Sequence, residues 1–126
     1  MNIFTDAMPM GSCDLGPYEA ILLGDIEAEG PITYIWALQI AHRDQPGVEV
    51  LFTAESSEGT DAILRQLGVG QDAPKEHHFC YFAKDGSHNN LGQMNLSNAG
   101  VFLGLAMLTA AELLGVSLSP SWTSSG

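Results

Sequence analysis

Basic side chains are scarce in this sequence of 126 residues, which holds four lysines and arginines against fifteen aspartates and glutamates and has a formal net charge of −11. Proteins neutralise nucleic-acid phosphates with clustered lysine and arginine, so this composition excludes direct nucleic-acid binding. Attraction to an anionic membrane needs the same clusters and is excluded on the same ground. We therefore expect a partner that is neither nucleic acid nor membrane.

The sequence has only two cysteines, Cys13 and Cys80, which are 67 positions apart. This separation fits no metal-binding spacing, and a lone disulfide would need an oxidising compartment. The first 16 residues lack the basic start and the apolar run of a signal peptide. We therefore expect two reduced thiols in a cytoplasmic protein.

No repeat, low-complexity tract or linker divides the chain, and 45% of its residues are hydrophobic. A chain of this size can bury enough apolar surface for one core. We therefore expect a single domain over residues 1–126. Its ends are expected to be an irregular segment at 1–17, where Met, Gly and Pro are frequent, and a polar tail at 117–126.

The pattern of apolar residues predicts five strands and two helices. Alternation with β-branched and aromatic side chains marks the strands, and apolar residues three or four positions apart mark the helices. The order β-β-β-α-β-β-α predicts an α+β fold, an antiparallel sheet of about five strands with helices packed on one face. The expected strands are 20–28, 32–42, 48–55, 78–83 and a weaker one through Leu91 and Met94; the expected helices are 60–68, capped by Thr60, and 98–116, capped by Ser97.

The register of the first three expected strands can be predicted from parity, that is, from whether residue numbers are odd or even. Directly paired antiparallel residues share a face of the sheet, so residues of one parity should lie together. The even positions of the three strands fall on one face if Ala28 opposes Ile32 and His42 opposes Val48. The two connecting loops then have lengths that are common in hairpins. In this register the even face forms the core. Its expected members are Leu22, Ile26, Tyr34, Trp36, Leu38, Ile40, Val50 and Phe52.

Acidic residues are concentrated early, since residues 1–61 hold eleven of them against one base, Arg43. The parity register places six together on the odd face: Glu19, Asp25, Glu27, Glu29, Glu49 and Glu55. Such a face could dock a basic partner with electrostatic steering, or it could be a solvated face that prevents aggregation. The expected partner-binding set is Asp25, Glu27, Glu29, Glu49, Glu55, Glu58 and Asp61.

Histidine and cysteine gather on the second expected hairpin, which contains His77, His78, Cys80 and His88. His78 and Cys80 share a face, so together with His88 they could supply three zinc ligands. The spacing matches no zinc motif, however, and a core cysteine beside loop histidines explains it better. A Cys80–His nucleophile pair would lack a third member, and acids along an open strand lack a cleft. We therefore expect no metal, no cofactor and no enzymatic activity.

The last expected helix is strongly apolar, since residues 99–116 carry one charge, on Glu112. Its length and the absence of flanking basic residues favour a core helix over a membrane span. If the helix is apolar all round, one side covers the sheet and the other contacts a partner or a second copy in a homodimer.

These features predict a small acidic binding protein that occludes a basic protein partner. The partner would be a toxin, with this chain as its immunity protein, or a nucleic-acid-binding enzyme, with this chain as an inhibitor that imitates phosphates. The first alternative is an acidic secretion chaperone or adaptor with an apolar helix–sheet interface. The second alternative is a small metal protein or enzyme that uses the histidines and cysteine.

Overall fold

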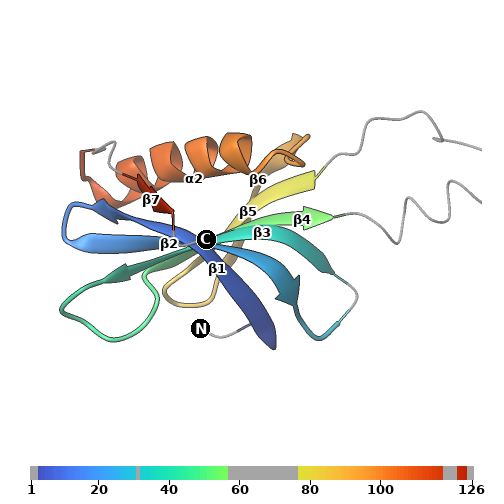
Figure 1. The fold of residues 1–126 in the computed structure, drawn as a ribbon, viewed down its shortest axis with the longest axis horizontal. Helices are drawn as coiled ribbons and strands as arrows, with labels where there is room; N and C mark the ends of the chain where they lie inside the picture. Colours follow the sequence, from blue (N-terminus) through green and yellow to red (C-terminus); the bar gives the residue numbers. More distant parts are fainter. Residues whose placement is uncertain (1–2, 31, 57–76, 118–121, 125–126) are drawn as a thin grey trace, which may run out of the picture.

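The computed structural model describes residues 3–30, 32–56, 77–117 and 122–124. They form an antiparallel sheet in the order β6-β5-β4-β3-β2-β1-β7, with helix α2 along one face (Figure 1). The fold class is α+β, as the sequence predicts, but six long strands and a short seventh replace the expected five. The elements are β1 (Asp6–Leu15), β2 (Tyr18–Glu27), β3 (Thr33–His42), β4 (Val50–Ser56), β5 (His77–Ala83), β6 (His88–Met94), α2 (Ala99–Leu114) and β7 (Trp122–Ser124).

The register predicted for the first three strands is confirmed at its centre. Leu22 pairs with Leu38, and Ile40 pairs with Val50, as the parity alignment requires. The even positions of these strands form the main core, which α2 covers; we call this side of the sheet the helix face. Its largest fully buried apolar side chains are Phe52, Phe102, Leu15, Leu38, Ile40 and Leu96.

The expectation of an irregular segment at 1–17 is wrong over Asp6–Leu15, which forms β1 and pairs along β2. Pro9 and Gly11 lower the strand propensity of this segment, and its pairing with β2 contains two register shifts, so no clean alternation marks it. The expected polar tail contains β7, whose three residues pair with β1. The sheet therefore extends beyond the predicted meander on its β2 side.

Two irregularities move side chains from one face of the sheet to the other. Asp25 in β2 has a left-handed φ of 45°, and Ile26 after it joins an apolar cluster away from α2. In β3 a register shift between Tyr34 and Trp36 makes Tyr34 the partner of Glu55. Each irregularity adds a residue and reverses the alternation beyond it. The assignment of Ile26 and Tyr34 to the even-face core is therefore wrong.

The face of the sheet opposite α2, which we call the far face, carries a second, smaller apolar cluster. Leu23, Ala37 and Leu51 are its buried centre, and none of its members comes from α2. Phe4, which precedes β1, packs against this cluster and meets the Tyr34 ring edge-on, with ring centroids 5.2 Å apart. The middle of the far face is thus apolar and not the continuous acidic surface that parity predicts.

Helix α2 matches the second expected helix, but its N-cap is Asn98 and not Ser97. The Asn98 side chain accepts hydrogen bonds from two backbone amides of the first turn, at 2.8 and 3.4 Å. The helix ends at Gly115, whose φ of 64° suits glycine. No helix among the described residues has the length and hydropathy of a membrane span. The helix predicted at 60–68 lies outside the described residues. The side chains that α2 buries are Phe102, Ala106, Met107 and Ala110.

Candidate functional site

The five described members of the acidic set predicted to bind a partner do not form one exposed surface. Glu55 is buried, and Glu49 is half-buried with its carboxylate 3.3 Å from the Lys84 ammonium. Glu58 and Asp61 lie outside the described residues. The predicted face of six exposed acids is therefore wrong, because Glu55 is buried, Glu49 is half-buried in an ion pair, and the irregularity at Asp25 moves Glu27 to the other face of the sheet. The exposed members of the predicted set are Asp25, Glu27 and Glu29.

Asp25 and Glu27 belong to the last residues of β2, and Glu29 follows that strand, next to the beginning of β1. The end of β2 and the beginning of β1 lie away from α2 (Figure 1). Asp6 in β1, which is also exposed, is the direct cross-strand partner of Glu27. Like charges that face each other across two strands destabilise the pairing. We call Asp6, Asp25, Glu27 and Glu29 the acidic end.

The lysine and arginine side chains in the described part of the chain are engaged elsewhere. Arg43 pairs with Asp14, and Lys84 pairs with Glu49. Asp14 is itself the cross-strand partner of Glu19, so that like-charge pair has a guanidinium beside it. The acidic end has no such cation among the described residues, and solvent or an external cation must balance its charge.

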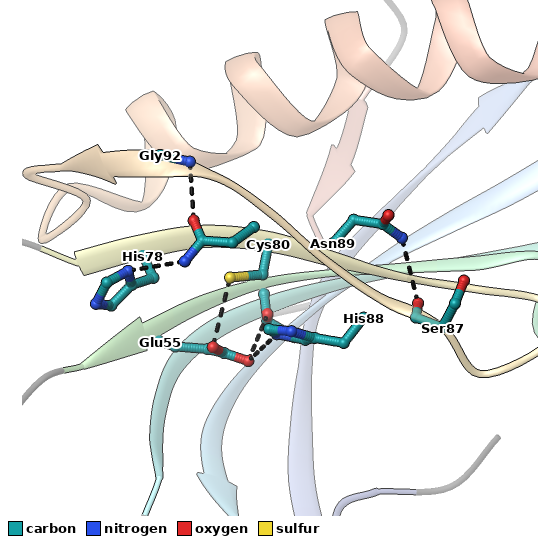
Figure 2. A network of polar contacts seen from close by, with 9 residues as sticks. Glu55, His78, Cys80, Ser87, His88, Asn89 and Gly92 are labelled. Atoms are coloured by element: carbon teal, nitrogen blue, oxygen red, sulfur yellow. Dashed lines mark hydrogen bonds and ion pairs between the residues drawn. The ribbon is translucent and has the colours of Figure 1, made fainter.

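A second group of polar side chains lies on the far face, where β4, β5 and β6 run side by side (Figure 2). One carboxylate oxygen of Glu55 is 3.0 Å from Nε2 of His88. The other accepts a hydrogen bond from the Cys80 thiol at 3.4 Å. We call Glu55, Cys80 and His88 the Glu–Cys–His cluster. Thr53 Oγ1, at 3.5 Å, donates to the same oxygen that faces His88.

Strand pairing explains how these residues meet. Thr53 and Glu55 are two positions apart in β4 and so share a face, and Cys80 in β5 is the direct partner of Thr53. His88 in β6 is the partner of Phe82, which is two positions from Cys80. Cys80 is therefore the diagonal neighbour of Glu55 on one side and of His88 on the other. Cys80 is fully buried, Glu55 is 6% exposed, and the His88 side chain is 40% exposed and forms the outer side of the cluster.

Electrostatics make the Cys80 thiol unreactive. Burial and the neighbouring Glu55 raise the pKa of Cys80 to about 12. Burial, Glu55 and Cys80 also raise the pKa of Tyr34. A buried thiol that stays protonated at neutral pH is a poor nucleophile. The arrangement is thus unsuited to cysteine-based catalysis.

His78, which was considered as a zinc ligand with Cys80 and His88, is not part of the cluster. Its ring nitrogens lie 3.0 Å from the Asn90 amide and 3.2 Å from the Gln93 amide. A register shift in the β5–β6 pairing falls between His78 and Cys80. The third member of the cluster is Glu55 instead. The sequence could not predict this, because 20 residues (57–76) separate β4 from β5 and so no short loop fixes the register of the two strands.

His77 occupies a different environment. It is buried, and its Nδ1 accepts a hydrogen bond from the Leu96 backbone amide at 3.0 Å. This contact ties the start of β5 to the segment that leads into α2. His77 is therefore a buried strand residue that links two segments, and not the loop residue that the sequence predicts.

Two groups of side chains thus stand out among the described residues. The acidic end is exposed and has no cation beside it, whereas the Glu–Cys–His cluster is mostly buried and bonded within itself. Comparisons of the chain with known protein families, curated proteins and solved structures found no match.

Proposed function

We propose that this protein is a small acidic binding protein that docks onto a basic protein partner and occludes it without chemistry. The observation that carries the proposal is the acidic end: exposed carboxylates on two adjacent strands, with Arg43 and Lys84 bound to other acids. A like-charge pair such as Asp6 and Glu27 weakens the sheet unless a cation approaches it. A basic partner would supply that cation and would be steered toward the site by the net charge of −11.

Two kinds of basic partner fit this surface. One is a toxin that acts on nucleic acid, in which case the protein is its immunity protein or antitoxin. The other is a nucleic-acid-binding enzyme, in which case the spaced carboxylates imitate phosphates. Both act on polyanions and so carry the lysine and arginine clusters that the acidic end would contact.

The proposal is of a binding protein and not of an enzyme, and the unreactive Cys80 thiol supports this choice. We further propose that it acts in the cytoplasm. Cys13 and Cys80 are both free thiols, and they lie on opposite faces of the sheet. Free thiols are the normal state of cysteine in that compartment.

The test is an affinity capture from the native host, with bound proteins identified by mass spectrometry. A variant that combines Asp25→Asn, Glu27→Gln and Glu29→Gln should fold normally and lose the partner, because asparagine also tolerates the left-handed φ of residue 25. A matched control combines Glu19→Gln, Asp44→Asn and Glu112→Gln, which removes the same charge from exposed acids elsewhere. The control should retain the partner.

Salt gives an independent measurement on the purified complex. Docking through the acidic end predicts that affinity falls as ionic strength rises and that the triple variant loses most of this dependence. Equal capture by both variants, or an affinity that is flat with salt, would contradict the proposal.

The exposed apolar side chains of α2 favour a second candidate, an adaptor or secretion chaperone. Val101, Leu108 and Leu113 are 48%, 57% and 49% exposed, so apolar surface remains on the helix away from the sheet. A partner or a second copy of the chain that covered α2 would bind in a salt-independent way. Leu108→Glu should abolish that association and leave docking through the acidic end intact.

A further inference from the structure

We propose that Glu55, Cys80 and His88 form a binding site for one zinc ion, independent of the acidic end. The three side chains come from three adjacent strands, and their ligand atoms all lie within 4.8 Å of one another (Figure 2). Zinc favours this combination of cysteine sulfur, histidine nitrogen and carboxylate oxygen. Calcium and magnesium, which take oxygen ligands, do not fit it.

The spacing suits a single ion. From ordinary zinc–ligand bond lengths, two ligand atoms on a tetrahedral zinc stand roughly 3.3–3.7 Å apart. In the structure one Glu55 oxygen is 3.0 Å from His88 Nε2, the other is 3.4 Å from Cys80 Sγ, and all the ligand atoms lie within 4.8 Å of one another. Small side-chain rotations are therefore enough to replace these direct contacts by bonds to a central ion, without movement of the strands.

Charge balance also favours a divalent ion. Glu55 is a buried acid that faces His88, which carries a positive charge only when it is protonated. Arg43 and Lys84, the arginine and lysine of the described part of the chain, pair with other acids. A buried carboxylate needs a compensating positive charge. Zinc binding displaces the Cys80 proton into solvent, so that one carboxylate and one thiolate balance the two charges of the ion, with His88 as a neutral third ligand.

The site would connect β4 to the β5–β6 hairpin. Three ligands leave a fourth tetrahedral position for water or for another donor. His88, at 40% exposure, gives the ion a route in from solvent, while Cys80 and Glu55 are shielded from it. We assign the site a structural role, because it joins elements that are distant in sequence.

The test uses the full-length chain, reduced, stripped of metal with a chelator and titrated with Co²⁺ and then with Zn²⁺. We expect one Co²⁺ per chain, with tetrahedral absorption and a thiolate-to-cobalt charge-transfer band that Zn²⁺ removes. Cys80→Ser should abolish that band, whereas Cys13→Ser should keep it, because Cys13 lies on the helix face. Absence of the band in the unaltered protein, or its survival in Cys80→Ser, would overturn the proposal.

A second pair of variants covers the case in which Cys80→Ser fails to fold. His88→Ala changes a side chain on the outer side of the cluster and should lower Zn²⁺ affinity by at least about 100-fold, the upper range for loss of a supporting residue around a metal. His42→Ala, at the end of β3 beside Tyr18 and away from the cluster, should change affinity by less than about twofold. Circular dichroism confirms the fold of each variant. Equal losses in both, or no loss in His88→Ala, would refute the site.

Discussion

The two faces of the sheet share the same strands but differ in the chemistry that they bury. In β4 every residue from Val50 to Glu55 is buried, so exposure does not distinguish the faces there. The helix-face positions of that strand carry Val50, Phe52 and Ala54, whereas the far-face positions carry Leu51, Thr53 and Glu55. The difference shows that one strand can contribute to an apolar core and to a polar cluster at once, because its side chains alternate.

The largest effect should come from removing an aromatic ring that α2 packs against the helix face. Phe102 is fully buried, and its ring packs edge-on against Phe79 with centroids 6.0 Å apart. Phe102→Ala should lower the free energy of unfolding by about 3–5 kcal/mol. Phe82→Ala, at a half-buried position on the far face, should lower it by less than about 2 kcal/mol. Chemical denaturation measures both, and similar losses would remove the proposed contrast between the faces.

A smaller effect should follow from loss of one hydrogen bond on the helix face. The Trp36 indole donates to the backbone carbonyl of Leu96 at 3.1 Å, and Leu96 is fully buried. Trp36→Phe leaves that carbonyl without its donor and should lower the free energy of unfolding by about 1–3 kcal/mol. Thermal and chemical denaturation of the variant test this, and an unchanged stability would show that the bond contributes nothing.

A pH titration of stability sharpens the comparison through Cys13 on the helix face. Burial and then Asp14 raise the pKa of Cys13 above 9.0. Above that pH the unfolded chain loses this thiol proton while the folded chain keeps it, so stability falls as pH rises. The difference in unfolding free energy between the unaltered protein and Cys13→Ala should shrink by up to about 1.4 kcal/mol per pH unit. A constant difference from pH 8 to 10.5 would contradict the assignment.

The smallest effect should come from the far face, at His78. Its contacts with Asn90 and Gln93 are exposed to solvent, where hydrogen bonds to water replace them. His78→Ala should change the free energy of unfolding by no more than about 0.5 kcal/mol. A fall of about 2 kcal/mol or more in the free energy of unfolding, which is typical of a buried contact, would contradict this prediction.

Sequence patterns predicted the parts of the fold in which alternation is uninterrupted. The pairing of Leu22 with Leu38 and of Ile40 with Val50 followed from parity alone. Parity failed beyond Asp25 and before Trp36, because an inserted residue reverses the faces and leaves no clear mark in the sequence. β1 was missed because Pro9 and its neighbours do not alternate between apolar and polar residues.

The candidate sites were also predicted only in part. Cys80 and His88 were recognised together, because they lie on one hairpin and a turn links their strands. Glu55 was assigned to the acidic surface, because its burial depends on the pairing of β4 with β5 across a long connection. Asp6, the fourth member of the acidic end, was missed because it belongs to a strand that the sequence did not predict.

The shape of β6 bears on how concentrated solutions of this protein behave. This strand is the last of the sheet on one side of the described structure, and its pairing with β5 is shifted between His78 and Cys80. Gly92 adopts a φ of 132°, and its amide donates to the Asn90 side chain (Figure 2). An irregular edge of this kind gives a strand from another molecule no straight backbone ladder to join, so it disfavours edge-to-edge polymerisation and fibril growth.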